Sequence, residues 1–312
     1  MKLIIQIPCY NEEETLPATL SELPKHIDGI DIIETLVIDD GSRDKTADIA
    51  NWNGVNHIVK LNRHVGLAGA FKTGLNECLK YGADIIVNTD ADNQYCAEDI
   101  EKLVKPILDK QADMVIGARP INNIKSFSPI KKLLQKCGSA FMRLVSSTKI
   151  EDAPSGFRAF SAEAANLLNV FDNYTYTMET IIQAKAKGLN VVSIPVRINP
   201  DTRKSRLVKN IFQYIKNSTF TMLRMFIVYR PFRFFVTFAI IFLLLGLILG
   251  GRFLYFYFTV GGNGHIQSLI LAAILILTGI QVGLIAVLAD LSAINRKLLE
   301  DIQIRVKKLE NK

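Results

Sequence analysis

The stretch Ile85-Ile86-Val87-Asn88-Thr89-Asp90-Ala91-Asp92-Asn93-Gln94 passes from an apolar run to two carboxylates that stand two positions apart. A short apolar run predicts a buried strand, and ligands of open α/β sheets bind at the carboxyl ends of the strands. Because alternate residues of an extended chain point the same way, Asp90 and Asp92 can face one ion. Carboxylate oxygens suit Mg²⁺ or Mn²⁺ holding a diphosphate. Asp-x-Asp also occurs in solvated turns, so this interpretation needs support from the rest of the chain.

Short apolar segments alternate with amphipathic ones over the first two hundred residues. Strands are expected at 2–7, 32–38, 57–61, 84–89, 113–117 and 190–196, and helices at 45–51, 66–81, 98–110, 162–168 and 177–187. Pro8 is expected to end the first strand, and 151–158 has the composition of a polar loop. The alternation predicts a doubly wound α/β domain with a mostly parallel sheet.

The C-terminal part of the chain carries most of the apolar excess. Segments 234–258 and 266–288 are each long enough to span a bilayer, and a glycine-rich turn between them predicts a hairpin. Segment 207–229 mixes basic and apolar residues, as interfacial helices do, although an ordinary surface helix has the same pattern. Four parts are therefore expected: a cytosolic domain at 1–206, juxtamembrane helices at 207–232, two spans at 233–290 and a cytosolic helical tail at 291–312.

Charge and cysteine content narrow the class of protein. The formal charge is +7, and 197–233 holds nine Lys and Arg against Asp201 alone. This asymmetry beside an apolar run predicts a surface that faces a membrane or phosphate, and no nucleic-acid-binding motif accompanies it. The four cysteines have no metal-binding spacing, and the apolar N-terminal run is too short for a signal peptide. Basic residues flank the spans, so both ends are expected in the cytoplasm.

Three motifs in this order resemble glycosyltransferase family 2, whose members have the GT-A fold: 7–13 (IPCYNEE), 37–42 (VIDDGS) and 90–92 (DAD). The motif at 155–158 (SGFR) and the hairpin make the chain similar to the polyprenyl-phosphate glycosyltransferases, which include dolichyl-phosphate mannose synthases and bacterial undecaprenyl-phosphate sugar transferases. The resemblance covers 4–206 and, with the hairpin, extends to about 292. It implies a Rossmann-like GT-A domain that moves a sugar, with inversion, from a UDP- or GDP-linked donor to a polyprenyl phosphate.

The resemblance also implies residue roles. Nucleotide-sugar contacts fall on Pro8, Tyr10, Glu12, Asp39, Asp90, Gln94, Arg203 and Ser205, with Mg²⁺ or Mn²⁺ on Asp90, Asp92 and Gln94. The implied catalytic residues are Asp92, Asp152 and Arg119, and the residues implied to bind the acceptor phosphate are Arg119 and Arg158. An ionised acceptor phosphate needs orientation more than deprotonation, so Asp152 is expected to position a substrate. Relatives often carry a glycine in the loop at 202–206, which has none here. Which of Arg203, Lys204 and Arg206 clamps the diphosphate is therefore left open.

Other classes of function compete with this interpretation. A processive polysaccharide synthase would carry Gln-x-x-Arg-Trp, but the single tryptophan is Trp52, and two spans are too few for a pore. A family 2 transferase with another acceptor in cell-wall synthesis, and a non-catalytic scaffold that binds nucleotide or lipid, remain alternatives. The expected partners are a nucleotide-sugar, a polyprenyl phosphate, the membrane and further copies of the chain, without nucleic acid. The expected location is the cytoplasmic membrane, with several passes. The sugar and the nucleotide are left open.

Overall fold

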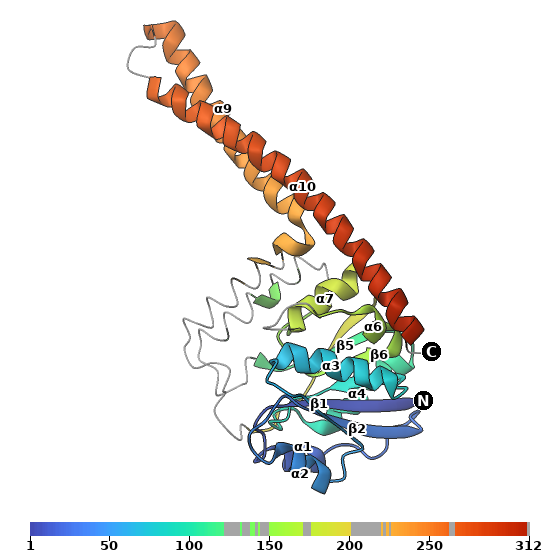
Figure 1. Cartoon of the computed structure of the whole chain (residues 1–312). Helices are drawn as coiled ribbons and strands as arrows, with labels where there is room; N and C mark the ends of the chain where they lie inside the picture. Colours follow the sequence, from blue (N-terminus) through green and yellow to red (C-terminus); the bar gives the residue numbers. More distant parts are fainter. Residues whose placement is uncertain are drawn as a thin grey trace. The chain divides into compact units, whose positions relative to one another are not determined.

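A computed structural model describes residues 1–121, 132, 138–140, 143, 150–170, 176–200, 220, 223–224, 226–261 and 266–310 (Figure 1). The chain divides into two compact units, Met1–Ser218 with Ile304–Lys312, and Thr219–Gln303. The predicted clamp with Arg203 and Ser205 lies outside the described residues, as does most of the predicted interfacial segment at 207–229.

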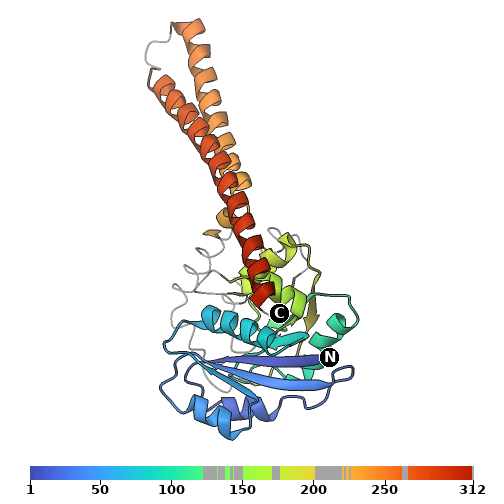
Figure 2. The ribbon, with the colours of Figure 1, turned by 45° about the vertical axis from the view of Figure 1, so that its right-hand side comes forward.

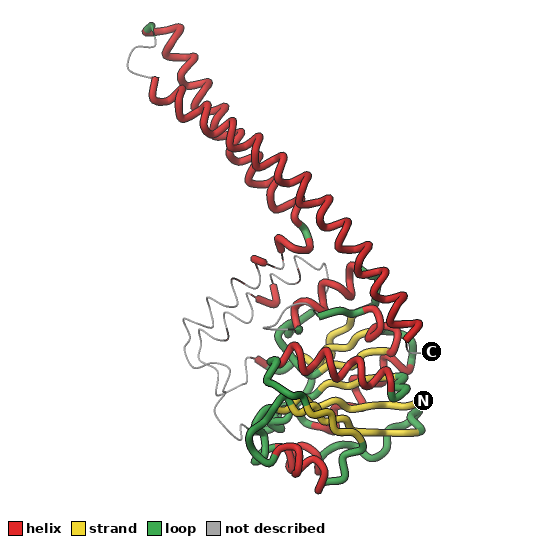
Figure 3. Tube along the Cα trace, viewed as in Figure 1, coloured by secondary structure: helices red, strands yellow, loops and turns green. Residues whose placement is uncertain are grey.

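The first unit contains one seven-stranded sheet with helices packed against it (Figure 3). The strands are β1 (Lys2–Cys9), β2 (Ile32–Asp39), β3 (His57–Lys60), β4 (Ile85–Asn88), β5 (Met114–Ala118), β6 (Arg158–Ser161) and β7 (Val191–Pro195). The helices are α1 (Leu16–Ser21), α2 (Thr46–Trp52), α3 (Leu67–Lys80), the 3₁₀ turn η1 (Ala97–Asp99), α4 (Ile100–Leu108), α6 (Ala162–Leu167) and α7 (Thr177–Ala186). The strand order is β3-β2-β1-β4-β6-β5-β7, and only β6 runs antiparallel to its neighbours. This mostly parallel sheet confirms the predicted fold class.

Alternate side chains of β1 point to opposite faces of the sheet. Leu3, Ile5 and Ile7 are fully buried in one core, which also contains residues of α1, α2 and α4. Gln6 points to the other face, where α3 crosses, and a Cβ at Gly74 of α3 would overlap its side chain. A glycine is therefore required at 74 for α3 to approach the sheet this closely.

The register of the parallel strands brings the candidate site residues to one edge. Cys9 pairs with Asp39, and Gln6 pairs with Asn88, so the carboxyl ends of β1, β2 and β4 lie at the same edge of the sheet. The loop that follows β4 carries Asp90. The antiparallel β6 starts at this same edge, because Arg158 pairs with Asn88. The preceding loop therefore meets the acidic edge of the sheet.

Two elements differ from the sequence prediction. The strand β6 was not predicted, because its four residues are too few to show alternation between a polar loop and a helix. The strand β1 continues through Pro8 to Cys9 instead of ending before Pro8. Pairing of β1 with β4 stops at Gln6, so Pro8 is paired with β2 alone and its missing N–H is tolerated.

The second unit holds α9 (Pro231–Val260) and most of α10 (Ile266–Glu310), two helices that are long and apolar enough to cross a membrane. They lie side by side in Figures 1 and 2 and approach closely at small residues. A Cβ at Gly246 would lie 2.7 Å from Cγ1 of Ile276, and one at Gly279 would lie 2.8 Å from Cγ of Leu243. Such contacts are typical of packed helices in membranes. The predicted boundary between span and tail at 290 falls inside α10, which has no break there.

Candidate active site

A buried polar network ties four segments together beneath the acidic edge. Nε2 of Gln6 donates to Oδ1 of Asn88 at 2.9 Å. Nδ2 of Asn88 donates to the carbonyl of Gly156 at 2.8 Å and to the hydroxyl of Tyr176 at 3.0 Å. The network joins β1, β4, the loop before β6 and the start of α7. It fixes the end of β4, from which Asp90 projects two residues later.

Asp90 is half-buried and lies against the loop before β6. A Cβ at Gly156 would be only 3.0 Å from its Oδ1. Among the residues that the structure describes, none donates a hydrogen bond to this carboxylate. Burial and the charge of Asp92 raise the pKa of Asp90 to about 7, while the charge of Arg119 opposes that rise. A carboxylate with these surroundings is stabilised by a bound cation.

The loop after β4 is held in place from the side of α1 and from the chain after β7. Oγ1 of Thr19 donates to the carbonyl of Ala91 at 3.0 Å. Nδ2 of Asn93, a residue with a φ of 54°, donates to Oε1 of Glu22 at 2.9 Å. Nδ2 of Asn199 donates to the Asn93 carbonyl at 3.1 Å and to Oε2 of Glu22 at 3.2 Å. These contacts give the Asp90–Asp92 loop a fixed backbone.

The residues of this loop fit a divalent cation that is shared with a substrate. The described residues contain no group of three or more His, Cys, Asp or Glu able to enclose a metal. Mg²⁺ is usually bound by one or two carboxylates together with substrate phosphates and water. Asp90 and Asp92 can supply such a pair, and the amide of Gln94 donates to Oδ1 of Asp92 at 3.1 Å. These two carboxylates can therefore supply part of a metal site that a substrate diphosphate would complete.

Asp39 and Asp40, at the end of β2, have different surroundings. Oδ1 of the buried Asp39 accepts from the amide of Ser42 at 2.9 Å, but no described residue donates to its Oδ2. Asp40 is instead satisfied by the amides of 65–66, at 2.7 and 2.9 Å, and by Nδ1 of His64 at 2.8 Å. A buried acceptor without a donor is costly, so Asp39 has an oxygen ready for a ligand hydroxyl or N–H.

The other predicted nucleotide contacts take three different positions. Tyr10 is 37% exposed, and its ring stacks on His64 with centroids 3.9 Å apart. Oε2 of Glu12 accepts from Oγ1 of Thr15 at 2.7 Å, and the Glu12 charge contributes to the raised pKa of Asp90. Pro8 is buried within β1. The structure thus leaves a ring of Tyr10 open to a ligand and places Pro8 in the sheet.

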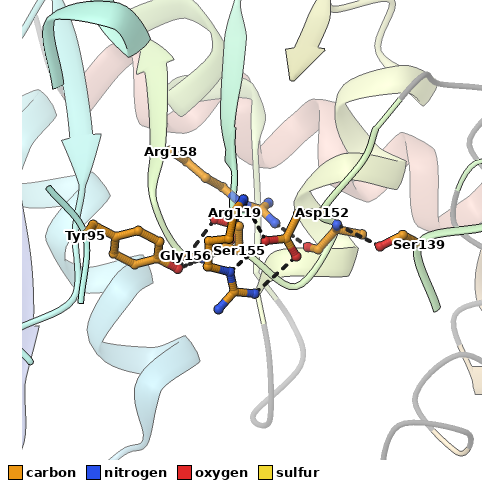
Figure 4. Close-up of polar contacts among 8 residues, drawn as sticks. Tyr95, Arg119, Ser139, Asp152, Ser155, Gly156 and Arg158 are labelled. Atoms are coloured by element: carbon orange, nitrogen blue, oxygen red, sulfur yellow. Dashed lines mark hydrogen bonds and ion pairs between the residues drawn. The ribbon is translucent and has the colours of Figure 1, made fainter. Parts of the chain in front are cut away.

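Arg119 and Asp152 form a nearly buried ion pair with two parallel hydrogen bonds (Figure 4). Nε of Arg119 donates to Oδ2 of Asp152 at 2.7 Å, and Nη2 donates to Oδ1 at 3.1 Å. The Arg119 amide donates to the same carboxylate at 3.3 Å. Asp152 is therefore committed to orienting Arg119. The Arg119 charge in turn lowers the pKa of Asp90, so the arginine and the acidic loop lie within electrostatic reach of each other.

Arg158 is fully buried and serves the protein interior. Its guanidinium donates to the carbonyls of Ser155 and Ala153 at 2.7 Å, and to the carbonyl of Thr177 and Oγ1 of Thr180 at 2.8 Å. These bonds hold the loop before β6 against α7. The family resemblance implies that Arg158 binds the acceptor phosphate, but the structure gives this side chain no exposed surface for a ligand. Arg119 therefore stays as the predicted contact to the acceptor phosphate.

Replacing Arg158 tests this correction. Arg158→Lys keeps the charge but loses the planar fork that reaches four oxygens, so the melting temperature should fall by roughly 10 °C. The KM for the acceptor in the folded enzyme should stay within about twofold of wild type. Thermal unfolding and steady-state kinetics measure the two quantities, with the exposed Arg63→Lys as the matched control. An unchanged melting temperature with a raised acceptor KM would restore the ligand role.

A second prediction concerns the substitution of Gly156. In Gly156→Ala the new methyl would lie 3.0 Å from Oδ1 of Asp90 and 3.0 Å from the Tyr176 hydroxyl, so the carboxylate has to move. We expect Mn²⁺ affinity in the presence of nucleoside diphosphate to fall about tenfold, as measured by titration calorimetry. Gly251→Ala is the control, because a Cβ there meets nothing within 4 Å. An unaltered Mn²⁺ affinity in Gly156→Ala would contradict the placement of the metal against Asp90.

Residues 4–168 match the sequence model of glycosyl transferase family 2, which is more than half of the chain and includes Asp39, Asp90, Asp92, Arg119 and Asp152. The chain belongs to this family.

Several relatives of this glycosyltransferase act on lipid phosphates according to their names. A UDP-N-acetylglucosamine–dolichyl-phosphate N-acetylglucosaminyltransferase of Methanococcus voltae is 33% identical over 214 residues, covering 61% of this chain and 83% of the relative. An undecaprenyl-phosphate mannosyltransferase of Micrococcus luteus is 28% identical over 206 residues, 63% of this chain and 83% of its own. An uncharacterised protein of Methanocaldococcus jannaschii is 39% identical over 205 residues, covering 63% of this chain and 81% of the relative.

A solved structure supports the fold of this family 2 glycosyltransferase. Glucosyl-3-phosphoglycerate synthase of Mycobacterium tuberculosis, crystallised with Mn²⁺, UDP-glucose and phosphoglyceric acid, matches with a TM-score of 0.54 and 19% identity. The match covers 71% of this chain and 79% of that structure. At this identity the likeness shows the GT-A-like fold alone.

Sequence reasoning missed the residues that support the site of this glycosyltransferase. Asn88, Glu22 and Asn199 bear no catalytic motif, and each acts through contacts with segments distant in the sequence. One signal was available for Asn88. A polar residue that ends an apolar run and is then buried in a strand needs partners.

Proposed function

We propose that this glycosyltransferase transfers a sugar from a nucleoside diphosphate to a polyprenyl phosphate held in the membrane. The observation that carries the proposal is the carboxylate pair Asp90 and Asp92. Among the residues that the structure describes, no further acidic, histidine or cysteine ligands enclose this pair, and an arginine fixed by Asp152 lies within electrostatic reach of it. The two apolar helices supply a means of reaching a lipid acceptor. The names of the relatives from Methanococcus voltae and Micrococcus luteus support the same acceptor class.

The reaction needs little proton transfer. An oxygen of the acceptor phosphate attacks the anomeric carbon, and the bond from that carbon to the diphosphate breaks, with the electron pair leaving on the diphosphate. A phosphate monoester has its second pKa near ~6, so the nucleophile is already ionised at neutral pH. A general base is then unnecessary, which agrees with an Asp152 carboxylate fully engaged by Arg119. Attack opposite the leaving group inverts the anomeric centre.

Each site residue takes a role that its contacts permit. Oδ2 of Asp39 accepts a hydrogen bond from the nucleoside, and Tyr10 presents a ring beside it. Arg119, held in one orientation by Asp152, binds the acceptor phosphate and reduces its repulsion from the donor. A bound Mg²⁺ or Mn²⁺ would be held by Asp90 and Asp92 and would neutralise charge on the departing diphosphate.

The experiment is a donor panel. Detergent-purified full-length protein is given polyprenyl phosphate with labelled UDP- or GDP-sugars, in Mg²⁺, Mn²⁺ or chelator. We expect one donor to label a chloroform-soluble product, and chelator to abolish the label. Nucleotide release without a labelled lipid would indicate a different acceptor. Nucleotide binding without turnover of any donor would favour a non-catalytic scaffold instead.

We also propose that both ends of the hairpin lie in the cytoplasm. Basic residues flank the two spans, at Arg230 and Arg233 before α9 becomes apolar and at Arg296 and Lys297 along α10. Cysteines introduced at exposed positions near each end should react with a membrane-impermeant maleimide only after the membrane is opened. Labelling of either end in intact cells would reverse the assignment.

A further inference from the structure

A cationic pocket of about 330 Å³ lies in the second unit, where α9 begins beside α10. The run Tyr229–Arg233 forms one wall. The other wall is one face of α10, made of Asp290, Ala293, Ile294 and Lys297 at helical spacing. The glycosyl transfer site uses none of these residues.

The pocket carries excess positive charge. Arg230, Arg233 and Lys297 contribute three cations, and Asp290 contributes one carboxylate. Within the part of the chain that the structure describes, none of the three cations forms an ion pair. Cations that converge on one concave space without an acidic partner for each of them favour an anionic ligand.

The pocket lies where charge resumes at one end of the hairpin. No charged residue occurs between Arg233 and Arg252 on α9, or from Ile266 to Asp290 on α10. The close contacts at Gly246 and Gly279 set the antiparallel register that brings Arg233 near Asp290. This level corresponds to the boundary between hydrocarbon and head groups, where lipid phosphates lie.

One wall of the pocket is held in place. The guanidinium of Arg296 lies over the ring of Tyr229, 4.4 Å from its centroid. Arg296 also pairs with Glu300 one turn further along α10, at 3.7 Å. The segment before α9 is thereby fixed to α10, so the pocket is formed before a ligand arrives.

We propose that this pocket binds the phosphodiester head group of a glycerol-bearing anionic phospholipid such as phosphatidylglycerol. Arg230, Arg233 and Lys297 bind the phosphate, and Asp290 accepts hydrogen bonds from the head-group hydroxyls. Asp290 also decides between lipid classes. Its carboxylate accepts hydrogen bonds that only a head group with hydroxyls can donate, and it opposes the extra attraction of the three cations for a dianionic phosphomonoester such as the polyprenyl phosphate acceptor.

The test titrates the detergent-purified full-length protein with short-chain phospholipids and reads binding by native mass spectrometry. Phosphatidylglycerol should bind, and phosphatidylcholine should not. In Arg233→Gln/Lys297→Gln the affinity for phosphatidylglycerol should fall about thirtyfold, because each cation near a membrane surface contributes roughly fivefold. Lys297→Gln alone gives a smaller loss if the double variant is unstable. Arg252→Gln, at the other end of α9, should bind as wild type.

Asp290→Asn tests the selectivity. This change removes both the carboxylate acceptor and its negative charge, so phosphatidic acid, a monoester without head-group hydroxyls, should gain affinity relative to phosphatidylglycerol. Three results would overturn the proposal. They are equal binding of phosphatidylglycerol and phosphatidylcholine, an equal loss in Arg252→Gln and in the pocket variants, and tighter binding of polyprenyl phosphate that depends on Arg233 and Lys297.

Discussion

Asp90→Asn is expected to abolish sugar transfer and, at pH 8, to raise the melting temperature of the metal-free enzyme. Transfer should fall about 10³-fold or more, because a carboxylate that binds the metal and balances the diphosphate is lost. Stability should rise because Asp90 is half-buried, lies beside Asp92 and receives no hydrogen bond from a described residue. Removing a charge that the fold holds at a cost stabilises the fold, although the proposed metal site requires the same charge.

The pH dependence follows from the direction of the Asp90 pKa shift. Burial and Asp92 raise the pKa of Asp90 to about 7 in the folded state, whereas the ordinary value is 3.8. The cost of ionising Asp90 is absent below pH 3.8, grows as the pH rises to about 7 and is constant above that pH. The gain in melting temperature from Asp90→Asn, about 2–4 °C or more at pH 8, should therefore shrink below pH 7 and vanish near pH 4.

Thermal unfolding with chelator or Mn²⁺ from pH 4 to pH 8 measures both halves of this prediction. Mn²⁺ should stabilise the wild type at pH 8 and not stabilise Asp90→Asn. In the wild type, Mn²⁺ affinity should fall about tenfold per pH unit below 7, because a proton competes for the carboxylate. Asp109→Asn, at an exposed position after α4, should change neither quantity. Metal-dependent transfer that survives in Asp90→Asn would exclude Asp90 as a ligand.

The acidic edge of the sheet could be predicted because its signals are local. Apolar runs that end in Asp39 and in Asp90 are visible in the sequence, and parallel strands bring their carboxyl ends to one edge. The structure confirms the mostly parallel sheet. It adds that Asp39, and not Asp40, has an acceptor oxygen without a donor among the described residues.

The surroundings of Asp90 could not be predicted, because they depend on chain crossings. Gly156 reaches Asp90 only because β6 inserts antiparallel between β4 and β5, and four residues give no readable period. Arg158 belongs to a stretch with the composition of an exposed loop, but the packing of α7 over that loop buries it. Local composition carries no information about which segment will cover another.

The pairing of Arg119 with Asp152 was also invisible, since 33 residues separate them in the chain. The resemblance implies a separate role for each residue, and the chemistry of an ionised acceptor favours a positioning role for Asp152. The structure joins them into one group, because the arginine satisfies both oxygens of the carboxylate. Their joint action can be tested.

Arg119→Lys and Asp152→Asn are expected to impair the same step. Each should lower kcat/KM for the acceptor by about 10²-fold, mainly through KM, because lysine lacks the bidentate fork and asparagine no longer fixes the arginine. The double variant should be little worse than either single variant, since residues that act as a unit give non-additive losses. Steady-state kinetics with varied polyprenyl phosphate measures the cycle.

If Asp152 acted as a general base, the kinetic parameters would change in a different way. Asp152→Asn would then lower kcat at unchanged acceptor KM and remove a limb of the pH–rate profile, and the two single losses would multiply. The pair Arg197 and Asp99 is a matched control, with Nε to Oδ1 at 3.0 Å, Nη2 to Oδ1 at 2.8 Å and the arginine amide also bound. The same changes there should couple in melting temperature and leave the acceptor KM unchanged. Arg197 is more exposed than Arg119, and the contrast between the two pairs separates the loss of an ion pair from the loss of an oriented arginine at the acceptor.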